Sequence, residues 1–250
     1  MVAEAGIDPD RVLVVGALCR DVLHAACGHE FGLRGTTDAD VGVALEDWGA
    51  AERIERAFPR IGSNGIRYLI AGIPVDVMPF GEVEDPAGVT EPAGRGEELV
   101  VFGFRDVYER ALSLPLPTGV SVRLHEPAGY AALKIRAWLD RGDDRDARDL
   151  AVATYWYRES ADVESWLFDS DEGMELLLRL DMDTDLVAAR LLGRDLLSSL
   201  SWENGMDLLE RWKGGDQGLL SRYFVAPPAA RWPMTASRRR EVVGQLLVAE

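Results

Sequence analysis

Three aspartates, Asp38, Asp40 and Asp76, are the residues whose type and spacing point most directly to chemistry. Asp38 and Asp40 stand at the start of an apolar run, residues 40–45, that is typical of a strand. Side chains two positions apart on a strand point to the same face. Asp76 lies inside a second apolar run, residues 73–78. If the two runs are neighbours in one sheet, three carboxylates meet in one small volume. Close carboxylates repel one another unless a cation joins them, so the pattern predicts a divalent-metal site of the kind that handles phosphates.

A pair of aspartates is also common on protein surfaces, so the segment before Asp38 matters. Residues 12–15 form a short buried-strand pattern that ends at Gly16, and a helix is expected to follow. A strand–glycine–helix corner presents free backbone N–H groups and the positive end of a helix dipole to an anion. Gly16 and Ala17 are therefore expected to cradle a phosphate. Arg20, one turn into the helix, is either a nucleotide contact or half of a surface ion pair with the next residue.

A second group of charged residues lies beyond residue 125, where the pattern is helical. Lys134 and Arg141 are seven positions apart, so they share one helix face, and a cation there can neutralise a metal-bound triphosphate. Asp146 and Asp149 lie three positions apart on the next expected helix and can orient Lys134 or a substrate hydroxyl. The alternative interpretation is a pair of helices joined by salt bridges, without a ligand.

The remaining pattern predicts an α+β protein. Strands are expected at residues 12–15, 40–45, 66–71, 75–80, 99–104 and 120–124, and helices at 18–27 and 48–58. The third and fourth strands are joined through residues 72–74, which is short enough for an antiparallel hairpin. Later segments are helical, at 127–141, 143–157, 163–168, 173–180, 185–200, 206–212 and 237–248. We therefore predict a catalytic core with a mixed or antiparallel sheet and flanking helices at residues 1–124, and an all-helical domain at residues 125–250.

The charge balance restricts the class of partner. The chain has 250 residues and a formal net charge of −16. This argues against a general nucleic-acid binder, because such proteins hold phosphates with basic side chains. A nucleic acid would need a local basic patch, for which Arg238, Arg239 and Arg240 are the candidates. The alternative for these three arginines is a solvated helix face.

The sequence also indicates the cellular compartment. No apolar run approaches the roughly 18 residues that span a bilayer, so no membrane association is expected. The two cysteines, Cys19 and Cys27, lie about 12 Å apart on one expected helix, too far for a disulfide. This spacing favours a reducing cytoplasm. The three histidines have no metal-ligand spacing and are expected to be structural.

Taken in chain order, these features resemble the DNA polymerase β-like nucleotidyltransferase superfamily. That superfamily combines a small-residue corner, an Asp-x-Asp strand and a third carboxylate on a neighbouring strand. The Arg-Asp pair at residues 20–21 is similar to the Gly-Gly-x-x-Arg-Asp corner of CCA-adding enzymes. Ala17 replaces the second glycine or serine, which removes any side-chain contribution there but leaves the backbone cradle.

A second block resembles one subgroup of that superfamily. The segment from Lys134 to Arg141, followed by Arg145-Asp146-Ala147-Arg148-Asp149-Leu150, looks like the Lys-x-x-Ala…Arg…Lys/Arg-Asp-x-x-Asp-Leu block of AbiEii-type nucleotidyltransferases. These are the toxins of type IV toxin–antitoxin and abortive-infection systems. The resemblance covers roughly residues 12–200.

The resemblance implies transfer of a nucleotide from an NTP to an acceptor hydroxyl with release of pyrophosphate. It implies that Asp38, Asp40 and Asp76 are catalytic and hold two Mg²⁺ ions, for which Mn²⁺ can substitute. The nucleotide-binding residues are then expected to be Gly16, Ala17, Arg20, Lys134, Arg141 and Asp146. The implied acceptor is the 3′ end of tRNA, in a toxin-like enzyme with a cognate antitoxin.

Other functions stay open from the sequence. The acceptor can instead be a small molecule, as in antibiotic-modifying nucleotidyltransferases, or a protein. A non-catalytic member that binds a nucleotide or a partner protein is a further alternative. Metal-dependent glycosyltransferases also use Asp-x-Asp, but theirs follows a larger nucleotide-binding region, whereas only 37 residues precede Asp38 here.

Overall fold

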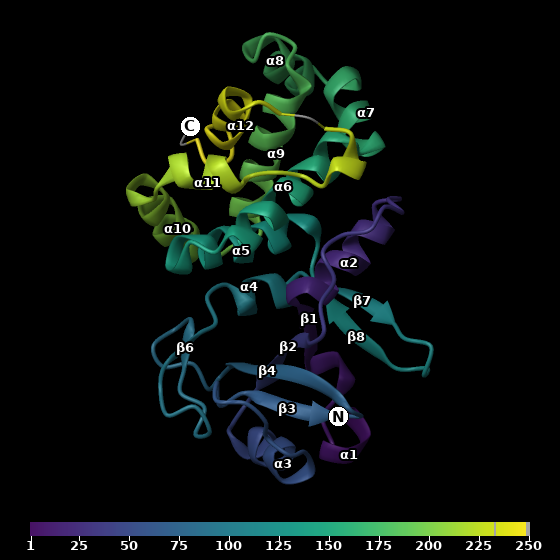
Figure 1. Cartoon of the computed structure of the whole chain (residues 1–250), viewed down its shortest axis with the longest axis vertical. Coiled ribbons are helices and arrows are strands. Elements are labelled where there is room, and N and C mark those ends of the chain that lie inside the picture. The colour runs from purple at the N-terminus through teal and green to yellow at the C-terminus, as the bar shows by residue number, and fades with distance from the viewer. Residues whose placement is uncertain (233, 249–250) are drawn as a thin grey trace. The chain divides into compact units, whose positions relative to one another are not determined.

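The chain divides into two compact units in the computed structural model, which describes residues 1–232 and 234–248. The first unit comprises residues 1–23 and 34–126, and the second comprises residues 24–33 and 127–250. The predicted α+β class is confirmed, with a strand-rich N-terminal part followed by helices (Figure 1). The expected boundary after residue 124 lies close to the division at 126–127. Residues 24–33, expected in the catalytic core, are part of the helical unit.

The first unit is organised around a mixed sheet. Its elements are α1 (Val2–Ala5), a 3-10 helix (Pro9–Arg11), β1 (Val12–Val15), the start of α2 (Gly16–Ala26), β2 (Ala39–Leu45), α3 (Gly49–Ala57), β3 (Arg67–Ile70), β4 (Ile73–Gly81), β5 (Val89–Thr90), β6 (Leu99–Val100), α4 (Phe104–Glu109), β7 (Leu112–Pro115) and β8 (Ser121–Leu124). Six strands form the sheet in the order β3-β4-β2-β1-β8-β7, and β5 pairs with β6. β2 runs antiparallel to β1 and parallel to β4, so the expected mixed sheet is present.

The two faces of this sheet differ in character. Val43 and Val77 lie on one face, where α3 covers them, because successive side chains of a strand alternate between faces. The opposite face carries the aspartates at one end and Phe80 at the other. The ring of Phe104 in α4 packs on Phe80 with 5.7 Å between ring centroids. Figure 1 shows α3 and α4 on opposite sides of the β3–β4 hairpin.

The segment expected as a strand at residues 99–104 is mostly something else. Only Leu99–Val100 forms a strand, and α4 begins at Phe104. The reason is Gly103, whose φ of 72° turns the chain into the helix. Strand β7 is not among the strands expected from the sequence. It lies at the edge of the sheet, where Pro115 is tolerated because an edge strand has backbone groups that need no strand partner.

The second unit is helical. Its helices are α5 (Pro127–Arg141), α6 (Asp144–Arg158), α7 (Ala161–Asp169), α8 (Asp171–Arg179), α9 (Thr184–Ser198), α10 (Trp202–Gly214), α11 (Gln217–Tyr223), the 3-10 helix Pro228–Ala230, and α12 (Ala236–Val243). The helix expected at residues 127–141 is confirmed with these bounds, and Pro127 occupies its first position. α6 packs against both α5 and α9 and is buried along most of its length, which makes it the centre of this unit.

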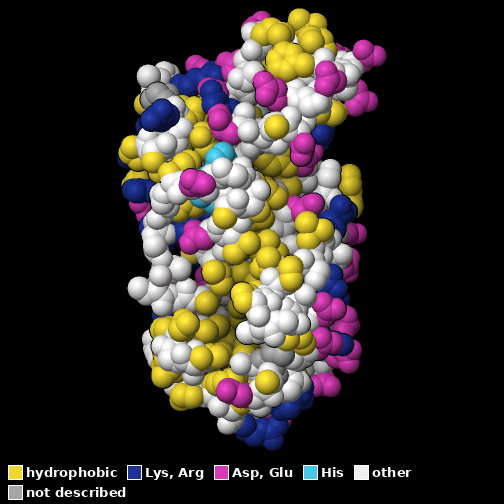
Figure 2. Space-filling model, turned by 90° about the vertical axis from the view of Figure 1, so that its right-hand side faces the viewer, with side chains coloured by type: hydrophobic (Ala, Val, Ile, Leu, Met, Phe, Trp, Pro, Cys, Tyr) yellow, Lys and Arg dark blue, Asp and Glu magenta, His cyan; other side chains and the backbone are white. Residues whose placement is uncertain are grey.

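Acidic side chains concentrate on α7 and α8. Phe168, Leu178 and Met182 expose hydrophobic side chains in the same region. Figure 2 shows hydrophobic side chains among acidic ones over these two helices, at the top of the view. Among residues 1–232 and 234–248, no helix has the length and apolarity to cross a membrane.

His125, just after β8, is expected to make stability depend on pH. It is buried, with Nε2 3.5 Å from Cys19 Sγ, and burial lowers its pKa to about 4. The unfolded chain protonates this histidine near pH 6.5, so acidification through this pH favours the unfolded state. The contribution amounts to about 2 kcal/mol between pH 7 and pH 5.

Urea denaturation at the two pH values, compared with the same pair of measurements on His125→Gln, isolates this contribution. The variant is expected to lose less stability than the wild type on acidification. An equal loss in both proteins would contradict the assignment.

Candidate active site

The structure brings the three aspartates to one end of the sheet. Asp40 on β2 is the register partner of Asp76 on β4, and these strands are parallel neighbours. Asp40 is also paired with Val15, the last residue of β1. Asp38 precedes Asp40 by two positions and therefore lies on the same face. One row across the sheet thus runs through Val15, Asp40, Asp76 and Arg67, the register partner of Asp76 on β3.

Arg67 links two of the carboxylates. Its Nε lies 2.7 Å from Asp76 Oδ1, and one terminal nitrogen lies 2.7 Å from Asp76 Oδ2 and 2.8 Å from Asp38 Oδ2. The guanidinium therefore forms a two-pronged bond with Asp76 and bridges to Asp38. The bond to Asp76 raises the pKa of Arg67 further above its ordinary value, with added contributions from the charges of Asp38 and Asp40.

Two neutral side chains complete the contacts of these carboxylates. Thr36 Oγ1 donates to Asp38 Oδ1 over 2.6 Å, and Asn64 Nδ2 donates to Asp76 Oδ1 over 3.1 Å. The Thr36 hydroxyl, together with the charge of Arg67, holds the pKa of Asp38 below its ordinary value. Asn64 Oδ1 also accepts from the backbone N–H groups of Ile66 and Arg67, which fixes the start of β3. The carboxylates of Asp38 and Asp76 are thus held in place.

Gly16 lies directly against Asp40 at the start of α2. A Cβ at this position would overlap Asp40 Oδ2 and would lie 2.8 Å from its Cβ and Cγ. The φ of Gly16 is also 64°, a value that L residues with side chains rarely adopt. Only glycine therefore allows this carboxylate to approach the first turn of α2, where the helix dipole favours a negative charge.

Gly16→Ala is expected to destabilise the fold and displace the Asp40 carboxylate. The left-handed φ costs about 1–2 kcal/mol for an alanine, and the overlap adds about 1–3 kcal/mol. Gly6→Ala is the matched control, because Gly6 has a φ of 61° and nothing within 4 Å of the added Cβ. Urea denaturation of both variants separates the two costs. Equal destabilisation of the two variants would show that the Asp40 side chain moves away from the added Cβ at no cost in stability.

The donor set fits a divalent cation. Three carboxylates on one sheet face supply the hard oxygen ligands that Mg²⁺ or Mn²⁺ prefers. Within residues 1–232 and 234–248, no group of three or more His, Cys, Asp or Glu side chains is already arranged around a common point as metal ligands. Oxygens of Asp38 and Asp76 are turned toward the guanidinium of Arg67.

Arg67 was missed from the sequence, although a signal for it exists. The hairpin pairs Ile70 with Ile73, so its turn is Ala71–Gly72 and not residues 72–74 as expected. Both turn residues have positive φ, 51° and 80°, as the two-residue turns of hairpins require. Counting back from this turn places Arg67 opposite Asp76.

Arg20 is buried within the fold. Its guanidinium donates to Asp21 Oδ1 and, over 2.6 Å, to the backbone oxygen of Arg34. It therefore anchors the loop that leads to the Asp-x-Asp strand. Its predicted contact with a nucleotide would require these bonds to be replaced.

The charged block of the second unit forms an ion cluster between α5 and α6. Lys134 Nζ lies 3.2 Å from Asp146 Oδ1 and 2.8 Å from Asp149 Oδ2. Arg141 binds both oxygens of Asp146, at 2.8 and 2.9 Å. Asp146 is fully buried. These contacts are those of the alternative interpretation, a pair of helices joined by salt bridges. A role for Lys134, Arg141 and Asp146 in nucleotide binding stays a prediction.

The expected basic patch is engaged in contacts within the chain. Arg238 pairs with Asp183, Asp185 and Glu241, and Arg239 donates to the backbone oxygens of Ser221 and Met234. The first of these arginines therefore neutralises acidic residues at the start of α9.

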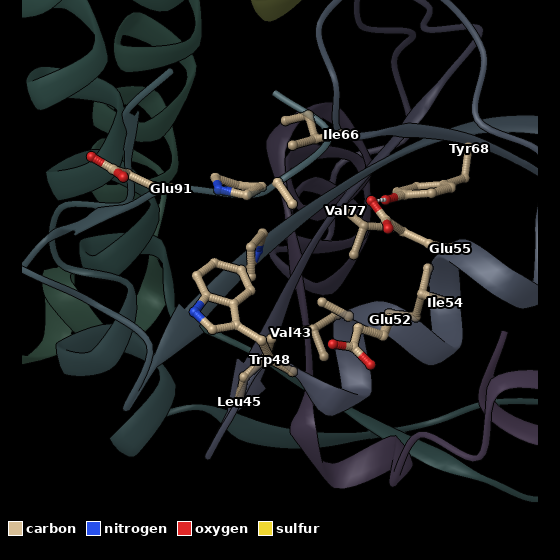
Figure 3. Close-up of a pocket in the computed structure, with 14 residues that line it drawn as sticks. Val43, Leu45, Trp48, Glu52, Ile54, Glu55, Ile66, Tyr68, Val77 and Glu91 are labelled. Carbon is tan, nitrogen blue, oxygen red and sulfur yellow. Dashed lines mark hydrogen bonds between the residues drawn. The ribbon is translucent and has the colours of Figure 1, made fainter. Parts of the chain in front are cut away.

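A separate cavity of about 190 Å³ lies on the other face of the sheet (Figure 3). Val43, Val77 and Ile54 form part of its largely apolar lining. Tyr68 and Glu55 lie beside each other at one side of it, with 3.5 Å between the hydroxyl and the carboxylate. Burial, aided by the charge of Glu55, raises the pKa of Tyr68 to about 12. A largely apolar cavity offers few polar groups to a triphosphate, so we place the candidate site at Asp38, Asp40 and Asp76.

Comparison with known protein families gives no match for this chain, and no curated protein sequence matches it.

Proposed function

We propose that this chain is a nucleotidyltransferase that moves a nucleotide from an NTP to an acceptor hydroxyl and releases pyrophosphate. The observation that carries the proposal is the row of Asp40 and Asp76, with Asp38 on the same face and Gly16 at the adjoining helix start. Carboxylates gathered in this way suit divalent cations, and a helix N-terminus suits a phosphate. Together they suit a metal-bound triphosphate.

Each residue of the site is assigned a role in this transfer. When bound, Mg²⁺ would neutralise the triphosphate and stabilise the attacking and leaving oxygens of an in-line displacement. Asp38 and Asp40 are assigned to the ion on the triphosphate, and all three aspartates to a second ion. The backbone N–H groups of Gly16 and Ala17 are assigned to the outer phosphates. Asp76 accepts the proton of the acceptor hydroxyl as its oxygen bonds to the α-phosphorus and the bond to pyrophosphate breaks.

The acceptor is proposed on the resemblance alone. The AbiEii-type pattern favours the 3′ end of tRNA, a toxin-like role and a cognate antitoxin. The net charge of −16 and the internal contacts of Arg238 and Arg239 argue against an extensive or non-specific contact with nucleic acid. A small hydroxylated molecule or a protein side chain is therefore tested beside tRNA.

Labelled NTPs test the proposal. Each α-labelled NTP is incubated with the purified protein and Mg²⁺, together with total tRNA, hydroxylated small molecules such as aminoglycosides, or protein substrates. We expect label to appear on one class of acceptor, with one equivalent of pyrophosphate released and complete loss of transfer in EDTA. Absence of transfer to every class, with no metal-dependent NTP turnover, would leave only a non-catalytic binding role.

A further inference from the structure

Arg67 is a cation that the proposed reaction does not yet explain. It lies on the edge strand β3 and donates three hydrogen bonds to two of the assigned metal ligands, Asp76 and Asp38. Its side chain is one-third exposed, whereas the side chain of Asp76 is 14% exposed. Its position is nevertheless well defined, because Asn64 fixes both the start of β3 and the Asp76 carboxylate.

The bridge has a consequence for cation binding. A divalent ion and a guanidinium neutralise the same carboxylate charge, and both need the carboxylate lone pairs. Asp76 turns both of its oxygens toward Arg67, so the positive charge of the guanidinium opposes the binding of an ion at the remaining lone pairs of this carboxylate. The affinity for an ion alone is reduced by this competition between two positive charges.

A nucleotide changes this balance. A guanidinium released from a carboxylate finds an equivalent two-pronged partner in a phosphate. An NTP brings such a phosphate to the site together with the ion. The ion frees Arg67, and the phosphate compensates the guanidinium for its lost bonds, so each ligand is expected to strengthen the binding of the other.

We propose that Arg67 couples the binding of the divalent cation to that of the nucleotide. In the free protein it acts as the counter-ion of Asp38 and Asp76, and in the complex it moves to a phosphate of the NTP. The site therefore binds the ion more tightly together with a nucleotide than alone. This inference rests on the proposed function, because it assumes a metal-bound triphosphate at these aspartates.

Mn²⁺ binding, followed by the EPR signal of the free ion, tests the coupling without turnover. Titrations are made with and without an NTP analogue that carries a methylene bridge between the α- and β-phosphates. The proteins are the wild type, Arg67→Gln, Arg67→Lys and Arg56→Gln. Arg56 is the matched control, because it is exposed on α3 and donates to the backbone of its own helix.

The coupling predicts that Arg67→Gln binds Mn²⁺ alone at least about tenfold more tightly than the wild type, since charge-assisted bonds of this kind no longer compete. The analogue should tighten Mn²⁺ binding strongly in the wild type and weakly in Arg67→Gln. Arg67→Lys, which keeps the charge but loses the fork, should lie between them. Arg56→Gln should behave like the wild type, which excludes a general effect of lost positive charge.

The outcomes that overturn the inference are distinct from those that overturn the proposed function. If the wild type transfers nucleotide but Arg67→Gln binds Mn²⁺ no more tightly than the wild type does, only the coupling is wrong. The same holds if the analogue tightens binding equally in both proteins. If no variant binds Mn²⁺ and the wild type turns over no NTP, both the coupling and the proposed function are wrong.

Discussion

Asp76→Asn is expected to lower the rate of nucleotide transfer at least about a hundredfold. Mutation of a residue that only hydrogen-bonds to a metal ligand typically lowers metal affinity or activity 10- to 100-fold, and loss of a ligand itself should cost at least as much. The change removes the charge that holds the ion and the group assigned to accept the hydroxyl proton. It keeps the size of the side chain and its place beside Asn64, so the chain should remain folded.

Transfer of labelled nucleotide measures the effect, with circular dichroism and thermal unfolding as tests of folding. Asp47→Asn is the matched control, because Asp47 is exposed beyond the far end of β2 and contacts only the start of α3 among the interactions described. Full transfer by a folded Asp76→Asn protein would refute the catalytic assignment.

Asp146→Asn is expected to destabilise the helical unit by about 3 kcal/mol, because removing one member of a buried ion pair leaves its partner without compensation. Asp146 is the shared partner of Lys134 and Arg141 and has no solvent contact. The cost stays at the lower end of the usual range because Lys134 keeps Asp149 at 2.8 Å and the Arg141 side chain is more than half exposed.

Urea denaturation measures this cost, and Asp144→Asn provides the comparison. Asp144 lies on the same helix and pairs with Arg148, but both side chains are largely exposed, so the loss should stay below about 1 kcal/mol. If the two variants lose equal stability, the ion cluster does not stabilise the fold. A loss of nucleotide affinity in Asp146→Asn with unchanged stability would favour the predicted binding role instead.

The closeness of the three aspartates could be predicted from the sequence, because it follows from the geometry of strands. Residues 38 and 40 share a face through the alternation of side chains, and Asp76 needed only to lie on a neighbouring strand. Arg67 could not be anticipated in the same way, because its position opposite Asp76 depends on the hairpin register. The expected turn at residues 72–74 would place a different residue opposite Asp76, whereas the observed turn at Ala71–Gly72 places Arg67 there.

Other features depended on tertiary contacts that a local pattern does not record. Apolar residues continue through Phe102 toward Phe104, but strand β6 ends at Val100 and the left-handed Gly103 precedes α4. The interpretation of Lys134 rested on residue types that serve a ligand site and an ion cluster equally well. Only the complete burial of Asp146 between two cations shows which bonds these side chains make in the structure.

The most direct test of the central claim is anomalous diffraction from crystals grown with Mn²⁺ and the uncleavable NTP analogue. We expect manganese peaks within coordination distance of Asp38, Asp40 and Asp76, with the triphosphate extending toward Gly16. Manganese bound elsewhere, with the Arg67 bonds to Asp38 and Asp76 intact beside an ordered nucleotide, would contradict the account.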